Sequence, residues 1–260
     1  MTASPLAALR SAIYMALLVI TVIPYAICVL LWFWLPMPRR YWMIQGWTGF
    51  AVWAGRAVCG MRWEVKGREN FPDGPAVVLC KHQSAWETLF LTVLLPRPLC
   101  YVYKREIHLI PFFGWAIQTL DMIHINRSKG QDAFEQVVEQ GSRRLAQGAW
   151  IIMFPEGTRM APGAAPRYKT GGARLAVRTG VPIVPIALNS GELWPRRAFV
   201  KLPGTITVSI GPPIPTQGLE PDEAGRRAQA WIEGEMHRIA PHRYPKQAAP
   251  SGAGAEGTPA

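Results

Sequence analysis

Charge is scarce in this chain, and acidic charge is missing from its N-terminal part. Charged residues make up 17% of the 260 residues and hydrophobic residues 49%, a charged fraction below that of a typical soluble protein. The first 61 residues contain no aspartate or glutamate, and residues 11–38 contain no charged side chain of either sign. This absence argues against a solvated N-terminal region and predicts a segment associated with a membrane.

Several motifs of cofactor and metal chemistry are also absent. The chain has no HExxH, no P-loop and no GxSxG, so we expect no metal, no bound cofactor and no serine-esterase site. No CxxC pair occurs, which excludes the usual disulfide frameworks and zinc sites. The cysteines lie in apolar surroundings and are predicted to be reduced, in a protein that faces the cytosol; they are Cys28, Cys59, Cys80 and Cys100.

The charged residues of the chain are mainly basic. The net charge is +11, and the first 61 residues contribute only arginines to it: Arg10, Arg39, Arg40 and Arg56. A basic protein with an uncharged segment is suited to an anionic membrane surface or to anionic substrates. Nucleic acid is the competing partner, but no basic helix or aromatic-interleaved binding motif is present. We therefore expect membrane lipids and no nucleic acid as partners.

Residues 1–61 are predicted to form a two-helix membrane motif. A helix over residues 11–38 would be about 40 Å long, more than the ~30 Å hydrocarbon core, with a kink at Pro24 and an end near Pro36 and Pro38. Residues 41–61 form a second apolar stretch, interrupted only by Arg56. Tryptophans, which prefer the headgroup level, occur in both segments: Trp32, Trp34, Trp42, Trp47 and Trp53.

A pair of buried core helices is the alternative interpretation of this region. The sequence also leaves open whether the helices span the bilayer or only dip into it. Arg39 and Arg40 follow the first apolar segment, and the excess of arginine favours a catalytic part on the cytoplasmic face of the inner (plasma) membrane.

The chain from residue 62 to residue 240 is predicted to be one α/β domain, in which a mixed, mostly parallel sheet is flanked by helices. Residues 241–260 are rich in alanine, glycine and proline and are predicted to be a disordered tail. Apolar alternation and short apolar runs predict strands at 62–66, 76–80, 99–103, 122–125, 150–153, 183–188 and 205–210. Helical periods occur at 85–95, 112–120, 132–147, 172–179 and 223–239.

A candidate base and a carboxylate follow the predicted strand 76–80. His82 and Glu87 are five residues apart, so they can meet only if His82 lies in the loop and Glu87 in the first helical turn. Ser84 and Glu87 also match the capping box S-x-x-E. The purely structural alternative is therefore that Glu87 caps the helix. The two roles are compatible, because a carboxylate has two oxygens.

This pair is suited to removing a proton from a hydroxyl. An imidazole with a pKa near 6.5 can accept that proton during attack, and a carboxylate bonded to its other nitrogen fixes the tautomer. No enzyme nucleophile is needed if the two substrates react directly. Cys80 is a poor candidate for one, because an apolar strand position raises a thiol's pKa.

A second motif, Phe154 to Arg159, follows the predicted strand 150–153. Pro155 interrupts the strand and Gly157 permits a positive φ, so that Glu156 and Arg159 project from a tight turn at a strand's C-terminal end. An arginine there is suited to a phosphate monoester. The alternative is a surface turn with an ion pair.

Together these motifs resemble the first and third sequence blocks of the glycerolipid acyltransferase family. Residues 104–107 with 110–114 resemble the second block, residues 125–127 its arginine-containing extension, and residues 181–186 the fourth. The resemblance covers roughly residues 63–210. The chain departs from the family pattern at Glu87, where the family has aspartate; the longer side chain leaves the base assignment intact but changes the geometry of the pair.

The resemblance implies an acyltransferase of phospholipid biosynthesis. Its expected reaction moves a fatty acyl group from acyl-CoA or acyl-carrier protein to the sn-2 hydroxyl of lysophosphatidic acid, giving phosphatidic acid, with His82 as general base and Glu87 as its partner. The alternatives are another acceptor, such as glycerol 3-phosphate or a different lysophospholipid, and a non-catalytic lipid-binding membrane protein. The residues implied to bind the acceptor are Lys104, Arg127, Glu156, Gly157, Thr158 and Arg159.

Overall fold

A seven-stranded sheet forms the centre of the protein in the computed structural model, which describes residues 4–125 and 130–244. The strand order is β1-β7-β6-β2-β5-β3-β4. Every strand pair is parallel except β6 with β7, so the predicted mixed, mostly parallel sheet is confirmed. The strands are β1 Met61–Lys66, β2 Val77–Cys80, β3 Leu99–Lys104, β4 Ile123–Ile125, β5 Trp150–Met153, β6 Ile183–Leu188 and β7 Gly204–Ile210.

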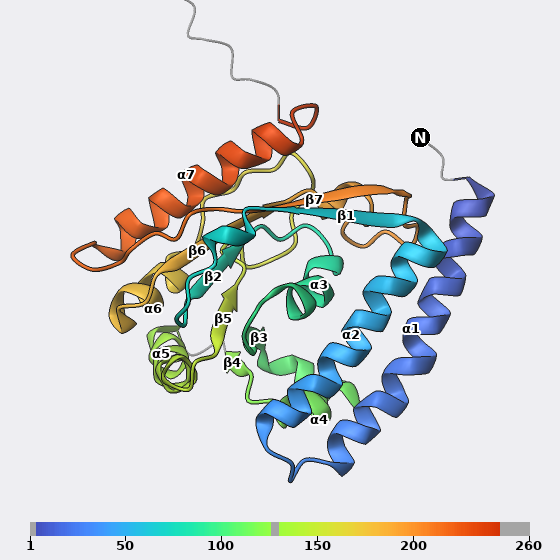
Figure 1. The fold of residues 1–260 in the computed structure, drawn as a ribbon, viewed down its shortest axis with the longest axis horizontal. Coiled ribbons are helices and arrows are strands. Elements are labelled where there is room, and N and C mark those ends of the chain that lie inside the picture. The colour runs from blue at the N-terminus through green and yellow to red at the C-terminus, as the bar shows by residue number, and fades with distance from the viewer. Residues whose placement is uncertain (1–3, 126–129, 245–260) are drawn as a thin grey trace, which may run out of the picture.

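Helices cover both faces of this sheet (Figure 1). The alternation of side chains along each strand separates two hydrophobic cores: in β2, Val78 faces one core and Val77 the other. Helices α1, α2 and α3 lie over the first face, and α5, α6 and α7 over the second. The α-helices are α1 Pro5–Leu31, α2 Met37–Cys59, α3 Trp86–Leu94, α4 Phe113–Gln118, α5 Gly130–Ala146, α6 Gly171–Thr179 and α7 Pro221–Ile239.

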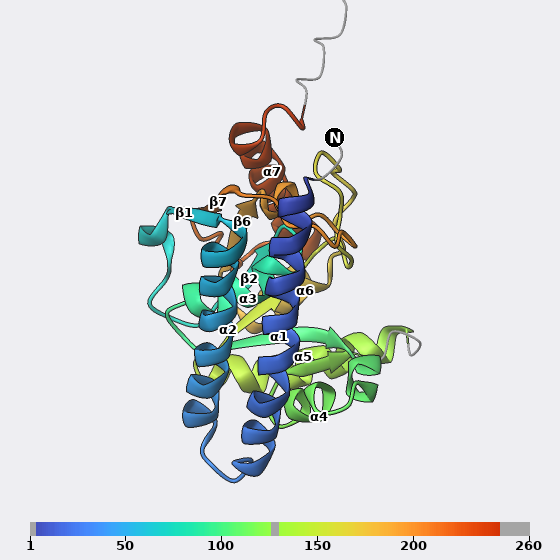
Figure 2. The same ribbon diagram turned by 90° about the vertical axis from the view of Figure 1, so that its right-hand side faces the viewer.

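The two N-terminal helices form an antiparallel hairpin along one side of the sheet (Figure 2). Pro24 lies within α1 without ending it, whereas Pro36 and Pro38 stand at the start of α2, where the fixed φ of proline is compatible with a helix. Within the described residues, α1 alone is long and apolar enough to cross a membrane, with a mean hydropathy of 2.5.

One face of α1 packs on the protein from end to end. Its buried residues are Ser11, Tyr14, Leu18, Ala26 and Val29, at the spacing of a single helix face. The opposite face exposes apolar side chains along the same length, including Leu9, Ile20 and Leu31. Tyr14 shares its core with strand residues such as Val78, so the helix pair and the α/β domain are built on common packing.

The C-terminal boundary is described only in part. Tyr244 is buried, and its hydroxyl lies 3.4 Å from the side-chain amide of Gln83. Residues 245–260, most of the predicted tail, lie outside the described residues. The same holds for Arg127 and its neighbours between β4 and α5.

Candidate active site

His82 and Glu87 meet where β2 leads into α3. Nδ1 of His82 lies 2.9 Å from Oε1 of Glu87, and this carboxylate is fully buried at position 87 in the first turn of α3. His82 itself lies in the loop, as the spacing requires. Because Nδ1 is engaged, Nε2 is the ring nitrogen that can take a proton from a substrate.

The carboxylate of Glu87 also binds the main chain that leads into α3. Its Oε1 accepts from the main-chain N–H groups of Gln83 at 2.8 Å and Ser84 at 2.7 Å, and its Oε2 accepts from the Ser190 hydroxyl at 2.7 Å. Ser84 Oγ accepts from the N–H of Trp86 at 3.1 Å. The predicted capping box is not formed as such, because the N-cap is Ala85 and has no side-chain bond. The contacts of Glu87 with the imidazole and with this main chain are combined in one side chain, and four donors hold its orientation.

Both the N–H and the carbonyl of His82 form hydrogen bonds with the segment that follows β5. Its N–H donates to Oε1 of Glu156 at 3.1 Å, and its carbonyl accepts from the N–H of Met160 at 2.7 Å. Its ring stacks on Phe154, with centroids 3.8 Å apart. Two segments some seventy residues apart in the chain therefore fix the imidazole together.

Behind His82 lies a buried charge cluster. Lys81 is fully buried; its Nζ is 2.6 Å from Oε1 of Glu233 on α7 and 3.6 Å from Oε1 of Glu156. Tyr168 donates to Oε1 of Glu233 at 2.7 Å. Among the described residues, Oε2 of each of these two glutamates has no hydrogen-bond partner. Glu156 thus contacts the protein interior, and its proposed contact with substrate stays a prediction.

Burial raises the pKa of Glu156 to about 7 from an ordinary value of 4.5, against the opposing effect of Lys81. The folded protein then binds a proton between pH 4.5 and 7 that the unfolded chain releases, so rising pH lowers stability through this window. We expect the free energy of unfolding to fall by an amount on the order of 3 kcal/mol from this group. Denaturation of Glu156→Gln should show a flatter pH dependence, and an unchanged slope would contradict this assignment.

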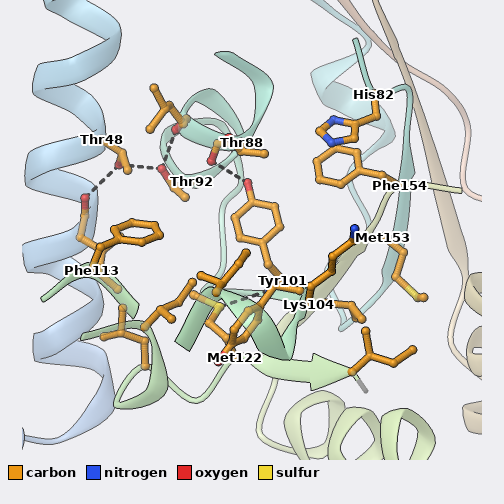
Figure 3. Close-up of a pocket in the computed structure, with 18 of the residues that line it drawn as sticks. Thr48, His82, Thr88, Thr92, Tyr101, Lys104, Phe113, Met122, Met153 and Phe154 are labelled. Carbon is orange, nitrogen blue, oxygen red and sulfur yellow. Dashed lines mark hydrogen bonds between the residues drawn. The ribbon is translucent and has the colours of Figure 1, made fainter. Parts of the chain in front are cut away.

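A cavity of about 890 Å³ opens beside His82. Its inner part is apolar, lined by residues of α1, α2, α4 and β3, such as Val29, Met43 and Ile117. In Figure 3, Tyr101 rises through the middle of this space and its hydroxyl donates to the carbonyl of Thr88 at 2.8 Å. A cavity with a polar reactive end and an apolar interior matches the two parts of a lipid.

Cationic side chains line the end of the cavity near His82. Lys104, at the end of β3, points toward His82 and Phe154 (Figure 3). Arg159, Thr158 and Gly157 line the cavity from the turn after β5, so the structure brings these predicted residues together with His82. Gly157 has φ +72°, and a Cβ there would lie 2.7 Å from Nζ of Lys169, which requires a glycine.

The chain is similar in sequence to known enzymes. A family model described as Acyltransferase matches residues 62–189. The 1-acyl-sn-glycerol-3-phosphate acyltransferase of Pseudomonas aeruginosa is 46% identical over 211 residues, which cover 80% of this chain and 82% of that protein. The chain belongs to the 1-acyl-sn-glycerol-3-phosphate acyltransferase family. It is therefore an acyltransferase.

Two further comparisons concern a human relative and the fold. The human 1-acyl-sn-glycerol-3-phosphate acyltransferase alpha is 36% identical over 168 residues, which cover 63% of this chain and 59% of that protein. The fold also matches the crystal structure of the 1-acyl-sn-glycerophosphate (LPA) acyltransferase PlsC from Thermotoga maritima. That match has a TM-score of 0.74 and 21% identity, and covers 89% of this chain and 95% of the other.

Several residues of the site in this family member were not predicted from the sequence. Lys169, Arg196 and Arg197 line the cavity, but they lie in irregular loops without a motif. Lys81 and Glu233 meet across 152 positions, which no local pattern could indicate. Ser190 was predictable in principle, because it lies two residues after a buried strand that runs parallel to β2.

Proposed function

We propose that this acyltransferase moves a fatty acyl group from a thioester donor to the sn-2 hydroxyl of 1-acyl-glycerol 3-phosphate, forming phosphatidic acid. The donor is acyl-CoA or acyl-carrier protein. The observation that carries the proposal is the His82–Glu87 pair at the boundary between the apolar interior of the cavity and its cationic end. Relatives named for this reaction in Pseudomonas aeruginosa and human support it.

In the proposed mechanism, Nε2 of His82 removes the proton of the acceptor hydroxyl as its oxygen attacks the thioester carbonyl. Glu87 stabilises the imidazolium that forms. The tetrahedral intermediate then collapses, the C–S bond breaks, and the imidazolium returns the proton to the leaving thiolate. The products are phosphatidic acid and a free thiol, with no covalent enzyme intermediate.

The acceptor phosphate is proposed to bind Lys104 and Arg159, with Thr158 and the main chain of Gly157 beside it. Arginine and lysine form charge-assisted bonds to phosphate oxygens. Arg127 remains a candidate for the same role and lies outside the described residues. The apolar lining from α1, α2 and α4 is suited to an acyl chain, because burial of each CH₂ contributes about 0.8 kcal/mol.

The exposed apolar face of α1 is proposed to contact the membrane. Near its start, Ser11 Oγ accepts from the N–H of Lys201 at 2.8 Å, and near its end Val29 packs with Leu120. A helix held to the domain at both ends cannot be surrounded by lipid, so we propose that it lies along the interface. The cytoplasmic side of the inner membrane is proposed from the arginine bias alone.

The assignment is tested with the purified full chain and a panel of substrates. Lysophosphatidic acid, other lysophospholipids and glycerol 3-phosphate are each paired with acyl-CoA and acyl-carrier protein, and products are identified by mass. Phosphatidic acid from lysophosphatidic acid is the expected main product. A preference for any other acceptor would overturn the proposed substrate while leaving the family assignment intact.

Lys104→Ala and Arg159→Ala should weaken acceptor binding with little change in kcat. A charge-assisted bond to phosphate contributes roughly 1.5–3 kcal/mol, so each variant should raise the acceptor KM at least about tenfold. Arg143→Ala is the matched control, because Arg143 is exposed and its ion pair among the described residues is with Glu139 at 3.2 Å. If both variants still prefer lysophosphatidic acid over monoacylglycerol as strongly as the wild type does, the phosphate assignment is wrong.

A further inference from the structure

Two arginines reach the cavity from a loop that the mechanism above does not use. Arg196 and Arg197 follow β6 and line the same cavity as His82. Both are exposed. Within the part of the chain that the structure describes, no hydrogen bond or ion pair engages either guanidinium. Two unpaired cations at a cavity wall are available to an anionic ligand.

The turn that carries them is strained and firmly anchored. The N–H of Ala198 donates to the carbonyl of Pro195 at 3.0 Å, and Arg197 has φ 61°. A turn of this kind favours glycine at that position, so an arginine there costs stability. Behind the turn, the buried Lys201 donates to the carbonyl of Phe199 at 2.6 Å and lies over the Trp194 ring at 4.8 Å.

The strand order separates the segment that carries these arginines from the elements that carry the acceptor cations. Strand β2, which leads into His82, lies between β6 and β5, and β3 follows β5 (Figure 1). All four strands run parallel, so their following loops lie at one edge. In the strand order, the segment that carries Arg196 and Arg197 follows β6 on one side of β2, whereas Arg159 follows β5 and Lys104 ends β3 on the other side.

Two substrates must reach the same imidazole, and the acceptor brings one phosphate. We propose that the turn of Arg196 and Arg197 binds the phosphates of the acyl donor, holding its thioester against His82 from the side opposite the acceptor. Both donor classes carry phosphate: CoA has a pyrophosphate and a 3′-phosphate, and the carrier's phosphopantetheine has a phosphodiester. The proposal rests on the proposed function and deepens it by assigning the donor a separate site.

A lipid headgroup is the second possible source of phosphate. Phe199 and Leu202, 56% and 40% exposed, follow the arginines and present apolar side chains at the surface. The lining of the catalytic cavity by both arginines favours the donor, because a headgroup in the bilayer would bind outside it. The test therefore separates the two sources.

The experiment compares wild type with Arg196→Ala/Arg197→Ala in donor titrations at saturating acceptor, and in acceptor titrations at saturating donor. The matched control is Arg226→Ala/Arg227→Ala, which removes the same charge from exposed positions on α7. Two donors are used: acyl-CoA, and an acyl-N-acetylcysteamine thioester without phosphate. We expect at least about a tenfold rise in the acyl-CoA KM, with the acceptor KM and the phosphate-free donor unchanged.

Arg197→Gly is a second variant that tests the role of the same turn. Removing the strain should raise the melting temperature by roughly 2–4 °C, while the acyl-CoA KM rises. A merely structural turn would give the first effect without the second, which would overturn the proposal.

Three other outcomes are informative. An unchanged acyl-CoA KM in the double variant, with weaker binding to vesicles containing anionic phospholipid, would assign the turn to lipid headgroups and overturn the donor site. Unchanged behaviour in both assays would show that the turn binds no phosphate. A wild type that fails to transfer acyl groups to lysophosphatidic acid would refute the proposed function itself, so the two failures are distinguishable.

Discussion

His82→Gln is expected to reduce kcat at least about 100-fold and to leave the fold intact. General base catalysis contributes roughly 10²–10⁴ in rate, and glutamine preserves a side-chain donor for Oε1 of Glu87. Glu87 contacts Nδ1 of the ring and Phe154 stacks on its face. The main chain of His82 is bonded to Glu156 and Met160. The measurement is initial rate at saturating substrates, with circular dichroism as the check on folding.

The matched control for this variant is His108→Gln. His108 bonds the Tyr103 hydroxyl at 2.6 Å through Nε2 and does not line the cavity among the residues described. It should keep nearly full turnover. Retention of more than about a tenth of the wild-type kcat by His82→Gln would remove His82 from the role of base.

Lys81→Met is expected to cost about 3–5 kcal/mol of stability. The substitution leaves the carboxylates of Glu156 and Glu233 buried beside each other without their shared cation. Methionine has a similar volume, so loss of charge and not of packing dominates. Chemical denaturation should also show the deficit shrinking as pH falls, because protonation removes the uncompensated charge. The displaced Glu156 should lower kcat as well, through the main chain of His82.

Two comparisons isolate the buried charge. Lys66→Met removes a lysine whose pairing with Glu64 is about half exposed at 3.1 Å, and an exposed pair of this kind contributes at most about 1 kcal/mol. Adding Glu233→Gln to Lys81→Met should restore part of the lost stability. Equal losses of stability in Lys81→Met and Lys66→Met would show that the buried charge cluster contributes no more than an exposed ion pair.

The departure from the family pattern at Glu87 has a structural consequence. The glutamate reaches back from the first turn of α3 to bond His82 and the main-chain N–H groups of Gln83 and Ser84. Contact with the imidazole and contact with the main chain before α3 are therefore made by the same side chain, and its role as the partner of a catalytic base stays a prediction. One buried carboxylate has enough acceptor sites for both.

The sequence by itself determined the elements of this protein and the candidate pair within them. Alternation and helical periods are local properties of side chains, and they located every strand of the sheet to within a few residues. His82 and Glu87 could be paired from sequence because only five positions separate them across one loop. The apolar character of α1 was equally local.

Only the tertiary structure decided what surrounds that pair. The order of strands brings the loops after β2, β5, β3 and β6 to one edge, and the chain gives no local signal of that order. Contacts such as Lys81 with Glu233 and Ser190 with Glu87 join residues more than 100 positions apart. They arise because buried polar groups must find partners wherever the packed fold provides them, and the arginines of the β6 loop reach the cavity for the same topological reason.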